Sequence, residues 1–211
     1  MPKKRPKPGK GSAYEREFCK KLSLWWSNGR REDIFWRTSQ SGGRATTRAK
    51  KDQTTVGQYG DIAATDPIGA PLMEVVTIEL KRGYPRATIH DLLDKSNGAA
   101  QQQFEKWVEQ VRESARLASS FSWMLVTKRD RRESLVWIPK SLATKLSLQH
   151  FGGIMGPNFN SDRVPANEFP TAFLFYFITL DDWIRCIKPN QIKALAREHQ
   201  DGWESTKEHR K

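Results

Sequence analysis

The sequence has few of the residues on which several common kinds of site depend. Its 211 residues include only two cysteines and four histidines, and neither type recurs at the short spacing that zinc ligands need. No apolar run approaches the roughly 18 residues of a membrane span, and the basic N-terminus lacks the apolar stretch of a secretion signal. Isolated cysteines are typical of reduced intracellular thiols. We therefore expect no zinc site, no membrane partner and a cytoplasmic location, with a nuclear one left open.

Three widespread catalytic motifs are also missing. The chain has no glycine-rich phosphate loop followed by Lys and Ser or Thr, no G-x-G-x-x-G, and no G-x-S-x-G turn. The first two motifs hold nucleotide phosphates, and the third presents a nucleophilic serine. The sequence therefore predicts neither a nucleotide-driven enzyme nor a serine hydrolase.

Positive charge is what the chain has in excess. With 36 Lys and Arg against 24 Asp and Glu, the net charge is +12, and the pI is near 9.9. Such an imbalance favours a polyanionic partner, although a ribosomal-type or membrane-surface protein would share it. The hydrophobic content of 37% and eight tryptophans are enough for a core, so we expect one domain with appendages.

Hydrophobic periodicity predicts α/β layers. We expect helices at Ser12–Ser27, from Thr88 through Leu93, and at Ala99–Leu117, Ser141–Ser147, Asp181–Ile187 and Asn190–Glu198, and strands at Asp33–Thr38, Ser122–Thr127, Ser134–Ile138 and Phe173–Leu180. The predicted divisions are a disordered basic tail (1–11), a core (12–138), a C-terminal α+β addition packed on that core (139–199) and a charged, frayed tail (200–211). Contact with nucleic acid, solubility and a nuclear-import-like role all remain open for the first tail.

The segment Leu72–Gly83 carries the most informative pattern. It reads as a buried β-strand interrupted by Glu79 and Lys81. Residues two apart share one face of a strand, so these two side chains project together and Leu80 points the other way. Such charges are costly at the end of an apolar strand unless they are paired or bound to a ligand. A surface hairpin with a weak ion pair is the alternative, because E-x-K is a common tripeptide.

A second carboxylate is expected beside this pair. Asp61 follows Gly60 at the start of an adjoining strand, and the turn signal Asp66-Pro67-Ile68-Gly69 predicts a hairpin that returns Asp61 toward Glu79. Two carboxylates and a lysine suit phosphodiester hydrolysis, because Mg²⁺ prefers a few carboxylate oxygens and activates bound water. Lys81 could orient or deprotonate that water, or neutralise the phosphate.

Glu15 has two interpretations. It follows Ser12 by three residues, which is capping-box spacing at a helix start. It also shares a helix face with Phe18 and Leu22, so its carboxylate could be a fourth member of the site.

Several polar and basic residues are candidates for contact with DNA. The stretch 39–58 is polar and contains glycine, which suits phosphate contact, although a solvated loop would look the same. Two glutamines align on the helix beginning near residue 99, where contact with DNA, orientation of the site and simple solvation are all open. The candidates are Arg37, Ser41, Arg44, Arg48, Lys50, Lys51, Gln103, Gln110, Lys128, Arg129, Arg131 and Arg132.

The chain resembles the PD-(D/E)XK nuclease superfamily. The resemblance rests on the order Gly11-x-x-x-Glu15-Arg16-Glu17-Phe18, Gly60-Asp61 and Glu79-Leu80-Lys81. The first motif, with the segment 36–42, is similar to archaeal-type Holliday-junction resolvases and related phage nucleases. Gly60 stands where the family's name motif has proline, and the residues after the core have no counterpart in the small resolvases.

The resemblance implies a restriction-endonuclease-like αβββαβ core with a mixed central sheet, in a bacterial, archaeal or phage-infected cell. Asp61 and Glu79 would hold Mg²⁺, for which Mn²⁺ should substitute, and the main-chain carbonyl of Leu80 is a further ligand. Lys81 would be the catalytic lysine and Glu15 the helix-borne acid. The expected activity is Mg²⁺-dependent hydrolysis of branched DNA by a homodimer. A sequence-specific restriction or homing-type endonuclease and a non-catalytic nucleic-acid-binding protein are the alternatives.

Overall fold

The computed structural model describes residues 10–38, 59–84, 86–87, 100–148, 154–155 and 175–208. The helices are α1 (Lys10–Trp26), η1 (Pro67–Gly69), α3 (Ala70–Val75), α5 (Gln103–Ala118), α6 (Lys140–Lys145), α7 (Leu180–Cys186) and α8 (Pro189–Glu208). The strands are β1 (Phe35–Arg37), β2 (Ile62–Ala64), β3 (Val76–Arg82), β4 (Ser122–Lys128), β5 (Ser134–Pro139), β6 (Ile154–Met155) and β7 (Phe175–Thr179). Within the described residues, every helix is too short or too polar to span a bilayer.

The central sheet is mixed, and its strand order is β3-β4-β5-β7-β6. β3 and β4 run parallel, and the other neighbours are antiparallel. A parallel connection needs a long crossover, and α5 lies in that crossover. The predicted α/β class with a mixed sheet is confirmed. Two separate short strands, β1 and β2, pair antiparallel beside the free edge of β3.

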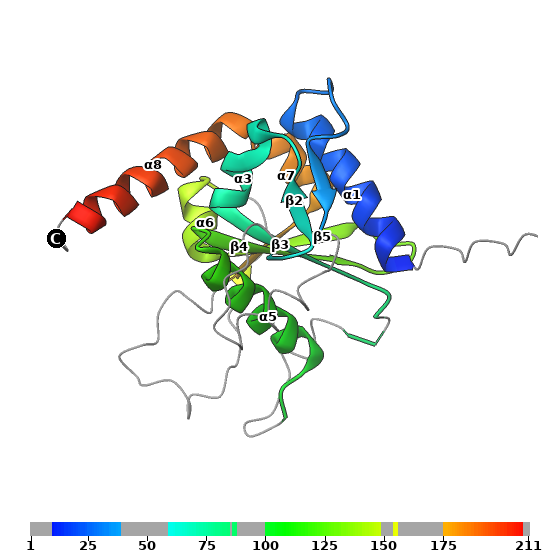
Figure 1. Ribbon diagram of the computed structural model, residues 1–211. Helices are drawn as coiled ribbons and strands as arrows, with labels where there is room; N and C mark the ends of the chain where they lie inside the picture. Colours follow the sequence, from blue (N-terminus) through cyan, green and yellow to red (C-terminus); the bar gives the residue numbers. More distant parts are fainter. Residues whose placement is uncertain are drawn as a thin grey trace, which may run out of the picture.

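Helices cover both faces of the sheet (Figure 1). α1, α3 and α8 pack on one face, where the larger apolar cluster includes Phe18, Leu80 and Ile192. α5 packs on the other face through Trp107 and Val111. Because successive strand residues face opposite ways, Met124 belongs to the first cluster and Leu125 to the second. The site described below lies between β3 and α5.

The predicted hairpin between Asp61 and Glu79 is wrong. β2 pairs with β1 rather than with β3, and η1 and α3 separate β2 from β3. Asp66 caps η1 by accepting a 3.0 Å hydrogen bond from the backbone N–H of Ile68. Proline stands in the first turn of both η1 and α3, where it favours helix initiation. The Asp-Pro signal therefore begins helical turns instead of closing a hairpin.

The C-terminal part contributes directly to the sheet and to the larger core. β7 lies between β5 and β6, while Trp183 and Ile192 are buried in the cluster that also contains Phe18 of α1. The indole Nε1 of Trp25 donates a 2.8 Å hydrogen bond to the carbonyl of Ile187. α8 continues through Glu208, so the expected frayed tail from Gln200 is helical over most of its length. The predicted helix at Thr88–Leu93 and the tail 1–9 lie outside the described residues.

Candidate active site

Glu79 is a buried carboxylate on the face of β3 that α5 covers. Its side chain is only 1% exposed. Its Oε2 accepts hydrogen bonds from Lys81 Nζ and from Gln110 Nε2, both at 3.2 Å. Ser114, one turn further along α5, directs its hydroxyl to Oε1 at 3.4 Å. Burial of a carboxylate is costly unless it is hydrogen-bonded, and these contacts provide that compensation.

Lys81 lies beside Glu79 on the same face. Its ammonium contacts Glu79 Oε2 at 3.2 Å and donates a 2.9 Å hydrogen bond to Gln110 Oε1. The side chain of Lys81 is 12% exposed, so the lysine lies at the opening of the site and Glu79 below it. Leu80 belongs to the apolar cluster on the opposite face. The alternation predicted for residues 79–81 is therefore confirmed.

Asp61 reaches the same place from the free edge of β3. Its backbone N–H donates to the carbonyl of Ile78 at 2.8 Å, and its Oδ2 accepts a 2.7 Å hydrogen bond from the backbone N–H of Leu80. Thr38 holds the other side of the turn, donating from its backbone N–H to the Asp61 carbonyl at 2.9 Å. Asp61 thus meets β3 through two local hydrogen bonds, without the hairpin expected from the sequence.

The turn before Asp61 requires glycine. Gly60 has a φ of +76°, in the region that L-residues with a side chain rarely occupy. A Cβ at this position would lie 2.6 Å from the carbonyl oxygen of Ile78 and 2.9 Å from Cγ2 of Thr77. Proline, which the family's name motif has here, is restricted to φ near −65° and does not fit this backbone. The departure from the motif therefore has a conformational cause.

The two carboxylates repel each other inside the protein. Burial raises the pKa of Asp61 to about 7, and the negative charge of Glu79 adds to that increase. The Leu80 N–H and the Lys81 ammonium act in the opposite direction but do not cancel it. Two buried acids with one nearby ammonium form a site with a deficit of positive charge. Hard divalent cations bind such sets of carboxylate oxygens, so the residues present fit a metal of this kind.

Glu15 and Arg37 form an ion pair beside this site. Glu15 Oε2 accepts from Arg37 Nη1 at 3.1 Å, joining α1 to β1. Cys19, buried one turn after Glu15, has its pKa raised to about 12, mainly by burial, and the charges of Glu15, Arg37 and Asp61 all act on it. The capping-box interpretation of Ser12 and Glu15 is wrong, because α1 begins at Lys10 and Ser12 lies inside it.

The carboxylates do not form a three-membered cluster. Among the residues that the structure describes, no three Asp, Glu, His or Cys side chains lie close enough together to hold an ion. Within the described part of the chain, Asp61 and Glu79 form a pair without a third acidic neighbour, and Glu15 pairs with Arg37 instead.

The candidate DNA contacts fall into three groups. Ser41, Arg44, Arg48, Lys50 and Lys51 lie outside the described residues. Of the two glutamines on α5, Gln110 joins the site, whereas Gln103 is exposed in the first turn. The four basic residues Lys128, Arg129, Arg131 and Arg132 end β4 and form the turn to β5.

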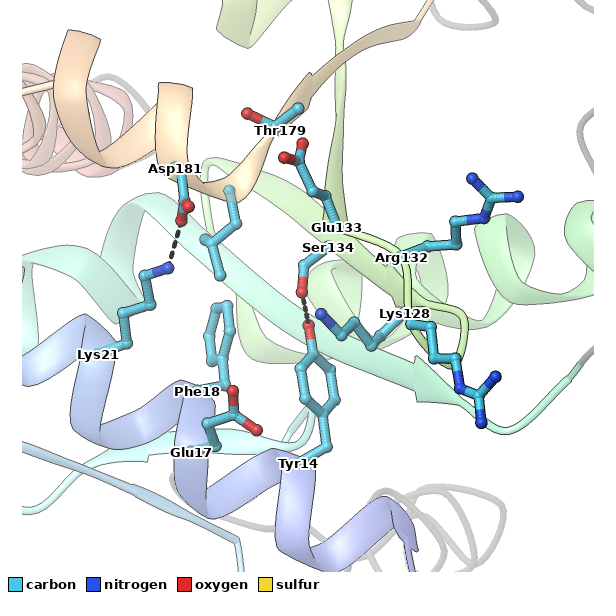
Figure 2. A pocket seen from close by; sticks show the side chains of 12 residues that line it. Tyr14, Glu17, Phe18, Lys21, Lys128, Arg132, Glu133, Ser134, Thr179 and Asp181 are labelled. Carbon is cyan, nitrogen blue, oxygen red and sulfur yellow. Dashed lines mark hydrogen bonds and ion pairs between the residues drawn. The ribbon is translucent and has the colours of Figure 1, made fainter.

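The β4–β5 turn borders a cavity of about 360 Å³ against α1 (Figure 2). At its base the Tyr14 hydroxyl donates a 2.8 Å hydrogen bond to Ser134 Oγ, and Lys21 pairs with Asp181 at its rim. Figure 2 shows the Lys128 ammonium directed toward the Tyr14–Ser134 pair, while Arg132 points away from it. Lys128 is the register partner of Arg82, the residue after Lys81. The basic turn and the carboxylate pair thus lie at the same end of β3 and β4, on opposite faces of the sheet.

Sequence reasoning missed two contributors. Ser114 contacts Glu79, and it lies four residues after Gln110, on the same helix face. Arg82 places its guanidinium over the Tyr14 ring, 5.6 Å from the centroid. Helical spacing from Gln110 could have indicated Ser114. Nothing in the local sequence pairs Arg82 with Tyr14.

Comparison with known proteins agrees with this geometry. The family model described as "Phage putative PDDEXK endonuclease" matches residues 7–194, a range that contains Glu15, Asp61, Glu79 and Lys81. No curated protein matches the chain, and neither does any solved structure. The match covers most of the sequence, and the chain belongs to this phage family of the PD-(D/E)XK nuclease superfamily.

Proposed function

We propose that this protein is a Mg²⁺-dependent endonuclease that hydrolyses phosphodiester bonds in DNA, with branched DNA as its substrate. The observation that carries the proposal is the buried pair Asp61 and Glu79 beside the ammonium of Lys81. Family membership supports a nuclease. The net charge of +12 supports a polyanionic substrate.

Asp61 and Glu79 would hold the metal, with Mn²⁺ able to replace Mg²⁺. The carbonyl of Leu80 is a suitable third ligand, because the Leu80 N–H faces the free edge of β3 toward Asp61. The N–H and C=O of one strand residue point to the same edge. A bound divalent ion would lower the pKa of a coordinated water and offset charge on the phosphate.

Lys81 is held where it can act on the attacking water or on the phosphate. Glu79 and Gln110 both bind its ammonium, which fixes its position. As an ammonium the lysine would orient water and neutralise phosphate charge; as a base it would first have to lose its proton. Gln110 contributes by binding Lys81 and Glu79 at once.

Glu15 and Arg37 would tune the site from the α1 side. Arg37 neutralises Glu15 in this structure. A DNA phosphate that drew Arg37 away would leave the Glu15 carboxylate free to complete or adjust the metal shell.

The element order α1-β1-β2-η1-α3-β3-α5-β4, with β3 parallel to β4, supports assignment of a restriction-endonuclease-like core in which η1 and α3 are inserted between β2 and β3. Residues 139–199, which include α6, β6, β7, α7 and the start of α8, would then be the addition to that core. A homodimer is expected by analogy with junction resolvases, which need two active sites to cut symmetrically.

The proposal is tested with a cleavage panel. Linear, flapped, single-stranded and four-way DNA are incubated with the wild type, Asp61→Ala and Lys81→Ala, with Mg²⁺ and with EDTA. We expect Mg²⁺-dependent cleavage of branched DNA by the wild type and loss of at least about 100-fold in both variants. Preference for linear DNA at a fixed sequence would indicate a restriction or homing-type enzyme. DNA binding with no cleavage of any substrate would refute the proposal in favour of a binding protein.

A further inference from the structure

The row of contacts between β3 and α5 continues past the proposed catalytic lysine to an aromatic pair. Two residues of β3 and one residue just after its end, Tyr84, each meet one residue of α5, and the helix residues follow at helical spacing on one face. The pairs are Glu79 with Ser114, Lys81 with Gln110, and Tyr84 with Trp107. Tyr84 therefore lies on the same side of the sheet as Lys81, one step further out.

Tyr84 is both exposed and held in place. The residue is 46% exposed, although its ring packs edge-on against Trp107, with centroids 4.9 Å apart at 68°. Trp107 is itself buried and packs against Phe104 at 5.5 Å. A large aromatic ring is therefore supported from one side and open to solvent on another. Aromatic rings in this arrangement are the usual platforms on which proteins stack nucleobases.

The distance from Lys81 limits which base could reach this ring. The Cα atoms of Lys81 and Tyr84 are three residues apart and so lie at most about 11 Å from each other. A base stacked on Tyr84 therefore belongs to a nucleotide close to the phosphate at Lys81. In a continuous duplex both faces of each base are covered by neighbouring bases. A base has a free face only where it is unpaired, splayed out or at an end.

We propose that Tyr84 stacks on an unpaired base beside the scissile phosphate, and that the substrate class is DNA with unpaired nucleotides at the cut site. Single strands, flaps and the opened centre of a junction belong to this class, and continuous duplex does not. The inference rests on the proposed function for the position of the phosphate. It goes further by stating that the DNA must have unpaired nucleotides at the cut site.

The test measures binding rather than cleavage. All proteins carry Lys81→Ala, so that the DNA stays intact with Mg²⁺ present. Dissociation constants are measured by fluorescence anisotropy for a single-stranded oligonucleotide and for a blunt duplex of the same length and sequence. The variants are Tyr84→Ala, Tyr84→Leu, which keeps an apolar contact with Trp107, and Tyr84→Phe, which keeps the ring.

Phe121→Ala is the matched control. Phe121 is also an exposed aromatic (37%) with an edge-on partner, His199. It precedes β4 at the end opposite Lys81, because β3 and β4 are parallel and Val76 is the register partner of Ser122. Its removal should leave single-strand binding unchanged.

We expect Tyr84→Ala and Tyr84→Leu to weaken single-strand binding about 5- to 100-fold, with less than about a 2-fold effect on the duplex. Tyr84→Phe should bind as the parent does. An equal loss on both DNAs, no loss in Tyr84→Ala, or no single-strand binding by the parent would each overturn the inference. Because cleavage is scored separately with Lys81 intact, a protein that binds through Tyr84 but never cuts would refute the nuclease proposal alone.

Discussion

The carboxylate of Asp61 is fixed to the backbone of Leu80 by a 2.7 Å hydrogen bond across the free edge of β3. The bond joins the residue before β2 directly to the middle of the E-x-K tripeptide. Asp61 therefore keeps its place although β2 does not pair with β3. Its position depends on the turn at Gly60 and on the two hydrogen bonds to β3.

Substitution of Gly60 should damage this turn severely. In Gly60→Ala, a Cβ would meet the Ile78 carbonyl at 2.6 Å in a backbone at φ +76°. We expect the free energy of unfolding to fall by about 2–4 kcal/mol, from strain and steric overlap together. Chemical denaturation measures this change. Gly83→Ala is the control, because Gly83 has a similar φ of +93° but nothing within 4 Å of the added Cβ, so it should lose only about 1 kcal/mol. Equal losses would show that the contact with Ile78 is unimportant.

Stability should depend on pH through Asp61. Its pKa is about 7 in the folded protein and 3.8 in its ordinary state, so the folded form binds more protons between these values. The contribution of Asp61 to the free energy of unfolding is therefore fully present below about pH 4. It is lost as the pH rises to about 7, by on the order of a few kcal/mol. Thermal unfolding across this range, without divalent ions, measures the effect. Asp61→Asn should flatten the profile, and an unchanged profile would contradict the assignment.

Divalent ions should reverse this loss. A cation that binds the ionised pair stabilises the folded state by mass action, and it competes with protons for the same carboxylates. We expect Mg²⁺ or Mn²⁺ to raise the melting temperature more at pH 8 than at pH 5, and to have little effect on Asp61→Asn. A metal effect that is the same at both pH values would place the ion elsewhere.

Gln110 should contribute to turnover by positioning Lys81 and Glu79. Gln110→Ala removes one acceptor from the Lys81 ammonium and one donor to the Glu79 carboxylate. We expect kcat to fall about 10-fold or more, with a smaller change in KM, by analogy with residues that orient metal ligands. Gln103→Ala tests the same residue type at an exposed position in the first turn of α5 and should leave kcat unchanged. An increase in KM with kcat unchanged would assign Gln110 to DNA binding instead.

The β4–β5 turn should contribute to the salt dependence of DNA binding. If Lys128 and Arg132 contact phosphates, each alanine variant should weaken binding to all sequences and reduce the slope of log K against log salt by about 0.9. Titrations between low and moderate salt give the slope. Lys145→Ala removes an equal charge from α6, where Lys145 pairs with Glu198, and should not change it. Unchanged slopes in the turn variants would show that this turn does not contact DNA phosphates.

The strand of the site could be predicted because its pattern is local. Alternation along residues 76–82 determines which side chains share a face, so the common direction of Glu79 and Lys81 followed from the sequence, with Leu80 opposite. The helix at α5 was also predictable, because Phe104, Trp107, Val108 and Val111 repeat at helical spacing and are buried together. In each case the sequence pattern lies within a few neighbouring residues.

The connection before the strand could not be predicted in the same way. Asp66 and Pro67 suit a hairpin turn and a helix start equally well. A helix forms here because Pro71 lies in the first turn of α3 and because Leu72 and Val75 are buried in it. The end of α8 was missed for a related reason, since the charged residues after Gln200 suggest a frayed end but do not stop a helix. The contacts of Gln110 and Ser114 with β3 join residues about 30 positions apart, and no local pattern encodes them.

β7, which lies between β5 and β6 in the sheet, is synthesised long after the residues of the proposed site. β5 has no partner on that side until β7 has been made, and α1 lacks the Ile187 carbonyl that accepts from Trp25 until α7 is complete. All four acidic and basic residues of the proposed site leave the ribosome more than 90 residues before β7 begins. A nascent chain therefore carries all four of these residues while it still lacks β7 and α7, and the complete framework can form only once residues 175–187 have been made.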